Sequence, residues 1–139
     1  MRVDPSAPVL VVDDSVTMRR IICTLLKQAG FRSVELVQSG AEALVQLRAK
    51  SYAIVISDWN MEPMSGYDLL KEIRSDNRLA NVRFLMISAE TSIDKVVAAK
   101  RARADSYLVK PFDAETLRKK IVEAFRSRDT MSQDLHQPA

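Results

Sequence analysis

The sequence predicts an α/β domain built on a five-stranded parallel sheet with helices on both faces. Short apolar runs alternate with segments whose apolar side chains recur every three or four residues, which is typical of repeated strand–helix units. The runs are nearly continuous, as expected for parallel strands that helices bury on both sides. A chain of 139 residues has room for one such domain and its core.

The five apolar runs are the expected strands. They cover residues 9–12, 34–37, 53–56, 84–87 and 107–109. Four of the five are rich in β-branched residues, which favour extended backbone. The run at 34–37 is short and is the weakest of them.

Five helices are expected between and after these runs. The apolar stripe of the first helix, which would face the core, consists of Met18, Ile21, Ile22, Leu25, Leu26 and Ala29. Gly30 then supplies its C-terminal cap. The second helix covers residues 41–50 and the third covers residues 66–74. The fourth is marked by Ile93, Val96 and Val97. Asp113 caps the last helix, whose inner face is Leu117, Ile121, Ala124 and Phe125.

Residues 8–126 are expected to form the domain, between a flexible N-terminus at residues 1–7 and a flexible, polar tail at residues 127–139. Cys23 is the single cysteine, which excludes a disulfide framework, and we expect it in the core. No apolar run approaches the roughly 18 residues of a membrane span, and the start lacks the apolar region of a signal peptide. We therefore expect a cytoplasmic monomer that does not bind membranes.

The net charge of +3 is unevenly distributed along the chain. Residues 92–128 carry ten basic and five acidic side chains, whereas residues 1–91 are neutral overall. Lys100, Arg101 and Arg103 are a basic cluster that is either a solvated surface or a site for an anionic partner. DNA is not expected as that partner, because no nucleic-acid-binding motif accompanies the charge.

Polar side chains follow four of the expected strands. Asp13 and Asp14 follow the first strand, Asp58 the third, Ser88 the fourth and Lys110 the fifth. Because the carboxyl ends of parallel strands meet at one edge of a sheet, these groups should form one pocket.

This pocket has the chemistry of a phosphoryl site. Crowded carboxylates repel one another and recruit a cation, and Mg²⁺ prefers such oxygen ligands together with phosphate oxygens. The charge of Lys110 and the hydroxyl of Ser88 suit the other side of a phosphoryl group, with a carboxylate as nucleophile. The alternative is that these aspartates only cap helices, which is common for Asp after a strand.

Four motifs resemble the receiver domain of two-component response regulators, and among these the single-domain CheY-like proteins. They are VVDDS at residues 11–15, SDWNM at 57–61, ISAE at 87–90 and YLVKPF at 107–112. The resemblance covers nearly the whole chain, with the motifs in the family's order and spacing. It implies a flavodoxin-like sheet with strand order 2-1-3-4-5.

The resemblance also implies a role for each residue of the pocket. Asp58 would accept the phosphoryl group, and Lys110 would pair with the phosphoryl oxygens. Ser88 would bond to the phosphate and act with Tyr107 as the conformational switch. The remaining implied roles are Mg²⁺ binding by Asp14, Asp58, the Asn60 carbonyl and, through water, Asp13; phosphate contact by the N–H groups of Trp59 and Ala89; and tuning of dephosphorylation by Asn60 and Glu90.

The implied function is a signalling switch that catalyses only its own phosphorylation and dephosphorylation. A histidine kinase or phosphotransfer protein would be the phosphodonor, in chemotaxis or a related phosphorelay. An output protein would bind the face formed by the fourth helix, the last strand and the last helix. In an alternative, the basic late segment binds an anionic ligand such as a cyclic dinucleotide.

A phosphatase with an aspartate nucleophile is the competing enzyme class. Such enzymes need a second Asp two positions after the nucleophile as general acid, but Ser15 and Asn60 occupy those positions after Asp13 and Asp58.

Two positions depart from the family pattern. Glu62 precedes Pro63, which places the proline one residue later than usual and predicts an altered loop beside the acceptor. Arg103 stands where glycine is common, which predicts an altered turn before the last strand. The Lys110–Pro111 peptide bond is expected to be cis, as in the family.

Overall fold

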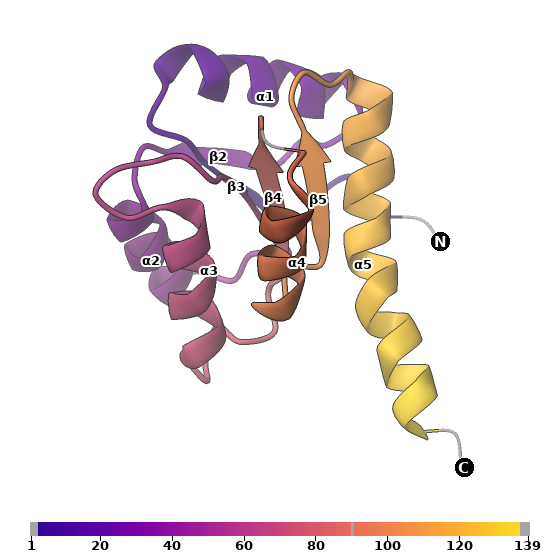
Figure 1. Cartoon of the computed structure of the whole chain (residues 1–139). Coiled ribbons are helices and arrows are strands. Elements are labelled where there is room, and N and C mark those ends of the chain that lie inside the picture. The colour runs from indigo at the N-terminus through magenta and orange to yellow at the C-terminus, as the bar shows by residue number, and fades with distance from the viewer. Residues whose placement is uncertain (1–2, 90, 137–139) are drawn as a thin grey trace.

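The computed structural model describes residues 3–89 and 91–136 and shows a central sheet between two layers of helices (Figure 1). The strands are β1 (Val9–Val12), β2 (Val34–Val37), β3 (Ile54–Asp58), β4 (Arg83–Ser88) and β5 (Ser106–Val109). All neighbouring strands are parallel, in the order β2-β1-β3-β4-β5. The predicted fold class and strand order are confirmed.

Within the described residues the helices are α1 (Val16–Gln28), α2 (Gly40–Ala49), α3 (Gly66–Ser75), α4 (Ile93–Arg101) and α5 (Ala114–His136). Side chains before the helices determine where several of them begin. Ser15 Oγ accepts a hydrogen bond from the Met18 N–H at 3.2 Å, and the predicted cap Asp113 accepts one from the Thr116 N–H at 2.8 Å. These caps satisfy N–H groups that have no partner inside the first turn.

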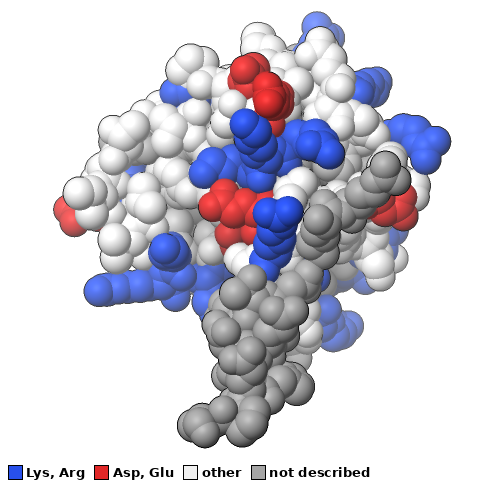
Figure 2. Space-filling view, turned by 90° about the vertical axis from the view of Figure 1, so that its right-hand side faces the viewer, with Lys and Arg blue, Asp and Glu red and all other residues white. Residues whose placement is uncertain are grey.

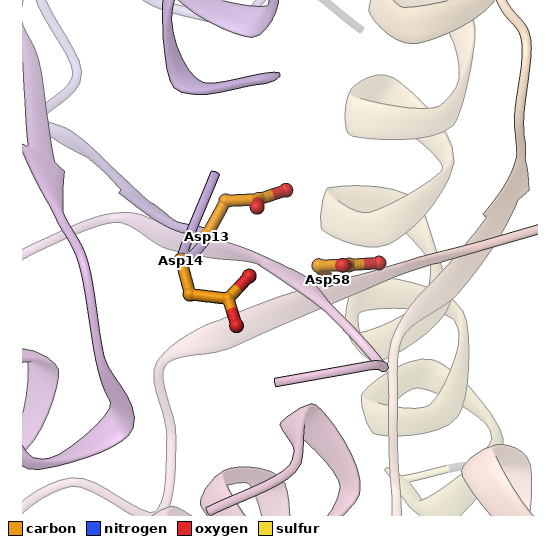
Figure 3. A group of neighbouring side chains, drawn as sticks. All are labelled: Asp13, Asp14 and Asp58. Atoms are coloured by element: carbon orange, nitrogen blue, oxygen red, sulfur yellow. The ribbon is translucent and has the colours of Figure 1, made fainter. Parts of the chain in front are cut away.

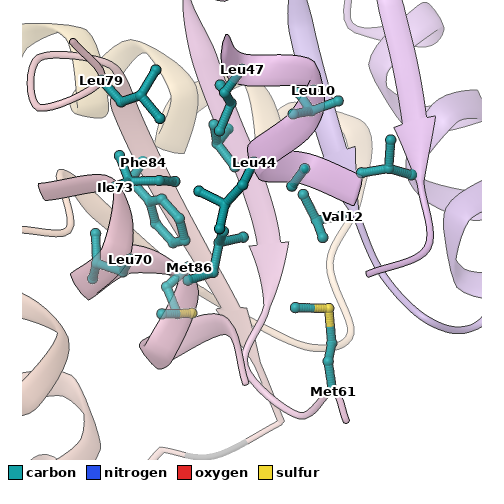
Figure 4. Packing of buried hydrophobic residues seen from close by; sticks show 14 residues of the cluster. Leu10, Val12, Leu44, Leu47, Met61, Leu70, Ile73, Leu79, Phe84 and Met86 are labelled. Atoms are coloured by element: carbon teal, nitrogen blue, oxygen red, sulfur yellow. The ribbon is translucent and has the colours of Figure 1, made fainter. Parts of the chain in front are cut away.

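The core has two parts, one on each face of the sheet, because successive side chains of a strand point to opposite faces. The part under α1 and α5 contains Val11, Ile56 and Ile87 from the strands. The part under α2 and α3 contains Leu10, Val12, Val55, Phe84 and Met86 (Figure 4). Burial on both faces explains why the strand sequences are apolar throughout.

The apolar stripe of the first helix differs in part from its predicted burial. Ile21 is 45% exposed, while Ile22 and Leu26 of the same helix are fully buried. Only one narrow face of α1 meets the sheet, and a step of about 100° per residue turns Ile21 away from it. On α4, Ile93 is 79% exposed, so the residues that mark this helix lie partly on its surface. Cys23, predicted in the core, is only half-buried.

The structure also shows contacts and helical turns beyond the predicted bounds of the domain. Residues 3–7, predicted to be flexible, form a turn in which the Pro5 carbonyl accepts a hydrogen bond from the Arg32 N–H at 2.9 Å, and Val3 packs against the core. Residues 1–2 and 137–139 lie outside the described residues. Helix α5 runs from Ala114 to His136, past residue 126, where the predicted domain ends. No proline or glycine stands between residues 112 and 137 to stop it.

The backbone is unusual at the two positions that depart from the family pattern. Arg103 has φ = +72°, so it takes the left-handed conformation that glycine adopts most easily. The turn is therefore the one that glycine would form, with a larger side chain on it. The Lys110–Pro111 bond is cis, as expected, and the Glu62–Pro63 bond is cis as well.

No helix among the described residues is long and apolar enough to cross a membrane.

Candidate functional site

Three carboxylates meet at the carboxyl edge of the sheet (Figure 3). Asp13 and Asp14 follow β1, and Asp58 ends the adjacent strand β3. One oxygen atom from each of the three lies within 4.8 Å of the other two. The predicted pocket is therefore formed, and its carboxylates come from neighbouring strands.

Asp13 is the most buried of these carboxylates, with 1% of its surface exposed. Its Oδ1 atom accepts a hydrogen bond from the Ser15 N–H at 2.9 Å, and its Oδ2 atom has no hydrogen-bond partner in the part of the chain that the structure describes. Burial raises the pKa of Asp13, and the nearby Asp58 and Asp14 raise it further, while the Ser15 N–H and Lys110 oppose this.

The donor set fits a hard divalent cation. Three carboxylates face one ammonium group, so the pocket carries an excess of negative charge. The Oδ2 atom of Asp13 is buried without a protein partner, which suits an atom that bonds to a metal ion or to its water. Asp14 is the exposed member of the three.

Lys110 reaches the pocket from the end of β5. Its Nζ atom lies 3.2 Å from Oδ1 of Asp58, and both side chains are largely buried. The Lys110 N–H donates to the Ser88 carbonyl at 3.0 Å, which ties the end of β5 to the end of β4. Ser88 is fully buried. The structure therefore brings the predicted carboxylates, lysine and serine to one edge of the sheet.

Gly66 allows the start of α3 to lie close to the end of β3. A Cβ atom at this position would lie 2.1 Å from the carbonyl oxygen of Asp58, which is not sterically possible. The Gly66 N–H donates to the Trp59 carbonyl at 2.8 Å, and Ser57 Oγ donates to the Asp58 carbonyl at 3.0 Å. The start of α3 thus packs directly on the backbone of Asp58.

Arg19 is a site residue that the sequence analysis missed. Its guanidinium donates to the carbonyl oxygen of Asp13 at 2.6 Å and so braces the loop that carries the aspartate pair. The available signal was a basic residue one turn into the helix that follows an acidic loop.

The backbone N–H and the ring of Trp59 both make contacts in the structure. Its N–H, expected to contact phosphate, donates to the Ile87 carbonyl at 2.8 Å and belongs to the pairing of β3 with β4. Its ring stacks on Tyr67, with centroids 5.2 Å apart, and meets Tyr107 edge-on at 6.5 Å. The Lys95 ammonium lies 4.9 Å from the Trp59 centroid. The predicted switch residue Tyr107 is therefore in contact with the residue next to Asp58.

The other predicted rim residues lie at the surface. Asn60 and Ala89 are exposed, at the ends of β3 and β4. Glu90 lies outside the described residues.

The predicted basic cluster is divided. Lys100 and Arg101 are exposed in the last turn of α4, but the Arg103 guanidinium donates to the Arg74 carbonyl at 3.3 Å. On the face seen from the α5 side, basic and acidic groups lie next to one another (Figure 2). The pairs on α5 are Lys119 with Glu115 at 3.5 Å and Lys120 with Glu123 at 3.2 Å. This face is mixed in charge.

Comparisons with known proteins agree with this geometry. The family model for the response regulator receiver domain matches residues 9–122. The chemotaxis protein CheY of Pseudomonas aeruginosa is 41% identical over 117 residues, which cover 84% of this chain and 94% of that protein. CheY-3 of Vibrio cholerae is 42% identical over 117 residues, with 84% and 90% covered.

Solved structures give the same result. CheY4 of Vibrio cholerae has a TM-score of 0.78 and 36% sequence identity, covering 86% of this chain and 98% of that one. The receiver domain of the Francisella response regulator 1452 has a TM-score of 0.78 and 28% identity, covering 88% and 99%. With the aspartates, lysine and serine at the predicted strand ends, these matches show that the chain belongs to the response regulator receiver domain family and is closely related to the CheY chemotaxis proteins.

Proposed function

We propose that this protein is a phosphorylation-operated switch whose acceptor is Asp58. The observation that carries the proposal is the Asp58 carboxylate, held 3.2 Å from the Lys110 ammonium with oxygen atoms of Asp13 and Asp14 within 4.8 Å. A carboxylate between an ammonium and a cation site is poised to accept a phosphoryl group. The proposed donor is the phosphohistidine of a kinase or phosphotransfer protein.

In the proposed step, an Asp58 oxygen attacks the phosphorus atom and forms a P–O bond while the P–N bond to histidine breaks. The electron pair of the broken bond stays on the histidine nitrogen. The Lys110 ammonium, which pairs with Asp58 before the reaction, then pairs with the phosphoryl oxygens. The Ser88 hydroxyl donates a hydrogen bond to one of these oxygens. Asp14, Asp58 and the Asn60 carbonyl would hold Mg²⁺, with Asp13 on a metal-bound water, and the ion would supply positive charge that offsets the charge of the phosphoryl oxygens.

We propose that phosphorylation is detected through a change in the conformation of the surface around α4. Phosphate on Asp58 would draw Ser88 and the loop after it inward, and Tyr107 would turn inward from its edge contact with Trp59. A weakly held α4 supports this proposal, because Ala99 is its one fully buried residue. An output protein that binds the face of α4, β5 and α5 would then sense the change, in chemotaxis or a related phosphorelay.

The test is incubation with acetyl phosphate and Mg²⁺. The wild-type protein should gain the mass of one labile phosphoryl group and change its Trp59 fluorescence. An Asp58→Asn variant should do neither, while a Ser88→Ala variant should gain the mass with a weaker spectral change. A wild-type protein that gains no phosphate would refute the proposal.

The same experiment addresses the enzyme alternative. Continuous release of phosphate from phosphate esters would indicate a phosphatase. The residues two positions after Asp13 and Asp58, Ser15 and Asn60, provide no second carboxylate as general acid, so we expect no such turnover. The cyclic-dinucleotide alternative stays a prediction and loses Arg103 as a freely presented cation, because that side chain is bonded to Arg74.

A further inference from the structure

We propose that Lys95 is a positioning residue that holds the start of α4 against the loop after β3 until Asp58 is phosphorylated. The Lys95 ammonium lies 4.9 Å from the centroid of the Trp59 ring, and Trp59 directly follows Asp58 in the chain. The inference rests on the proposed function, because it concerns how α4 responds to a phosphoryl group on Asp58. It adds the side chain through which α4 contacts the residue next to the acceptor.

The Trp59 ring is a fixed platform for this contact. The Trp59 N–H donates to the Ile87 carbonyl at 2.8 Å, and the Trp59 carbonyl accepts from the Gly66 N–H at 2.8 Å. The ring stacks on Tyr67, with planes 8° apart. A cation that contacts this ring is therefore tied to α3 and to the ends of β3 and β4.

Each of the two stacked rings contacts one lysine. The Lys71 ammonium lies 4.7 Å from the Tyr67 centroid, much as Lys95 lies from Trp59. Among the residues that the structure describes, no carboxylate pairs with either ammonium group. Lys71 is exposed and belongs to the same helix as Tyr67, whereas Lys95 is half-buried and comes from α4. Of the two contacts, the one made by Lys95 joins separate elements, and partial burial strengthens it.

Few other contacts hold the start of α4. Ala99 is the fully buried residue of this helix, Ser92 makes no side-chain cap, and Ile93 is 79% exposed. A lysine in the first turn is also unfavourable for the helix itself, because the N-terminal N–H groups carry partial positive charge. The contact with Trp59 therefore offsets a cost that Lys95 imposes on its own helix.

The Trp59 ring also meets Tyr107 edge-on, with centroids 6.5 Å apart. In the proposed switch Tyr107 turns inward and leaves this contact, so the ring that holds Lys95 loses a neighbour when Asp58 is phosphorylated. The Lys95 contact then favours the unphosphorylated position of α4. Because coupling between two sites is reciprocal, the same contact should weaken the binding of a phosphoryl mimic at Asp58. The expected factor is about two- to fivefold, the range that an exposed cation–π contact supports.

Amide hydrogen exchange of the full chain without Mg²⁺ tests the contact. Lys95→Met keeps a long side chain of similar helix propensity but removes the cation, and it should speed exchange at residues 96–101 about two- to fivefold. Lys71→Met is the matched control, because it removes the same charge from the neighbouring ring, and it should leave these rates unchanged. Lys95→Arg, which returns a cation to the ring, should restore the wild-type rates. If Lys95 acted only on its own helix, Lys95→Met would slow exchange, so slower exchange or equal rates in the two Met variants would overturn the proposal.

Titration with beryllofluoride in the presence of Mg²⁺, followed by backbone-amide NMR, tests the coupling to Asp58. Beryllofluoride takes the place of a phosphoryl group on a carboxylate. Lys95→Met should bind it about two- to fivefold more tightly than the wild type, whereas Lys71→Met should match the wild type within twofold. Equal affinity in Lys95→Met and the wild type would overturn the inference about Lys95 and leave the switch function intact. A wild-type protein that binds no beryllofluoride would refute the switch function and, with it, the coupling.

Discussion

Single residues determine the properties of the aspartate pocket. Asp13 is buried with an oxygen that lacks a described partner, and its raised pKa reflects first its burial and then the neighbouring carboxylates. Gly66 leaves space for the Asp58 carbonyl. Arg103 takes a backbone conformation that most side chains disfavour. Each feature predicts the effect of one substitution.

Asp13→Asn should stabilise the metal-free protein at neutral pH. Folding raises the pKa of Asp13 above its ordinary value of 3.8. The wild-type protein therefore loses stability as the pH rises and the Asp13 carboxyl group ionises. The asparagine oxygen can still accept from the Ser15 N–H. The difference in the free energy of unfolding should disappear below about pH 3.8, where Asp13 is protonated in both states. Urea unfolding with a chelator at several pH values measures it, and a pH-independent difference would contradict this interpretation.

Gly66→Ala should destabilise the protein and slow phosphorylation. The new Cβ would overlap the Asp58 carbonyl oxygen, and relief of such overpacking costs about 1–3 kcal/mol and shifts the acceptor. Gly40→Ala is the matched control, because its Cβ would meet the flexible end of Met64. Denaturant midpoints and phosphorylation rates with acetyl phosphate should change less in the control.

Arg103→Gly should give a more stable protein than Arg103→Ala, by about 1 kcal/mol. Both variants lose the Arg103 side chain and its contact with Arg74, so their difference isolates the left-handed backbone at φ = +72°. Thermal unfolding of the two variants measures it. Equal stability would show that the backbone at this position relaxes without cost.

At the scale of helices and strands, one buried polar group joins the ends of several elements. The Arg74 guanidinium on α3 donates to Asp105 at 3.0 Å and to the Arg103 carbonyl at 2.9 Å. Asp105 accepts in turn from the Phe84 N–H at the start of β4 and from Ser127 on α5. These bonds fix the C-terminal side of α4, whereas Ser92 at its start makes no side-chain cap.

Asp105→Ala should lower the free energy of unfolding by about 3–5 kcal/mol, because it leaves a buried guanidinium without its carboxylate. The Arg74 and Asp105 side chains are 5% and 6% exposed. Asp76→Ala breaks the exposed pairs with Arg48 and Arg78 and should cost less than about 1 kcal/mol. Chemical denaturation compares them, and similar losses would argue against a special role for the buried pair.

At the scale of the whole molecule, the parallel sheet separates two regions that are rich in charged residues. The carboxyl ends of β1 and β3 carry three aspartates, and cations line two cavities at the amino ends of β3 and β4. The first region is the proposed phosphorylation site. The same connectivity that gathers one set of residues at one edge places the other set at the opposite edge.

Mg²⁺ should stabilise the whole domain, because a ligand that binds only the native state adds free energy according to its concentration relative to Kd. A concentration one hundred times Kd adds about 2.7 kcal/mol. The melting temperature of the wild type should therefore rise with Mg²⁺ and fall again with a chelator. Asp14→Asn should reduce this response, and an unchanged response would exclude Asp14 as a ligand.

The sequence alone predicted the family, the strand order and the cluster of Asp13, Asp14, Asp58, Ser88 and Lys110. Periodicity and the common edge at which parallel strands end predicted the cluster, whereas the resemblance of four motifs to receiver domains implied the family and the strand order. The prediction that Ile21 faces the core was wrong, because a stripe of apolar residues does not show how much of a helix meets the sheet. The contacts of residues 3–7 and the end of α5 are not encoded in such a pattern, because single contacts and the absence of a helix-breaking residue decide them.

The sequence by itself determined which chemical groups meet at the carboxyl edge, since strand order and motif spacing are properties of the chain. Only the tertiary structure decided the environment of each group. The partnerless oxygen of Asp13, the contact of Gly66 with Asp58 and the Arg19 bond to the Asp13 carbonyl depend on distances of a few ångströms. So does the contact of Lys95 with the Trp59 ring. Such distances arise from packing between elements far apart in the chain, which no local pattern encodes.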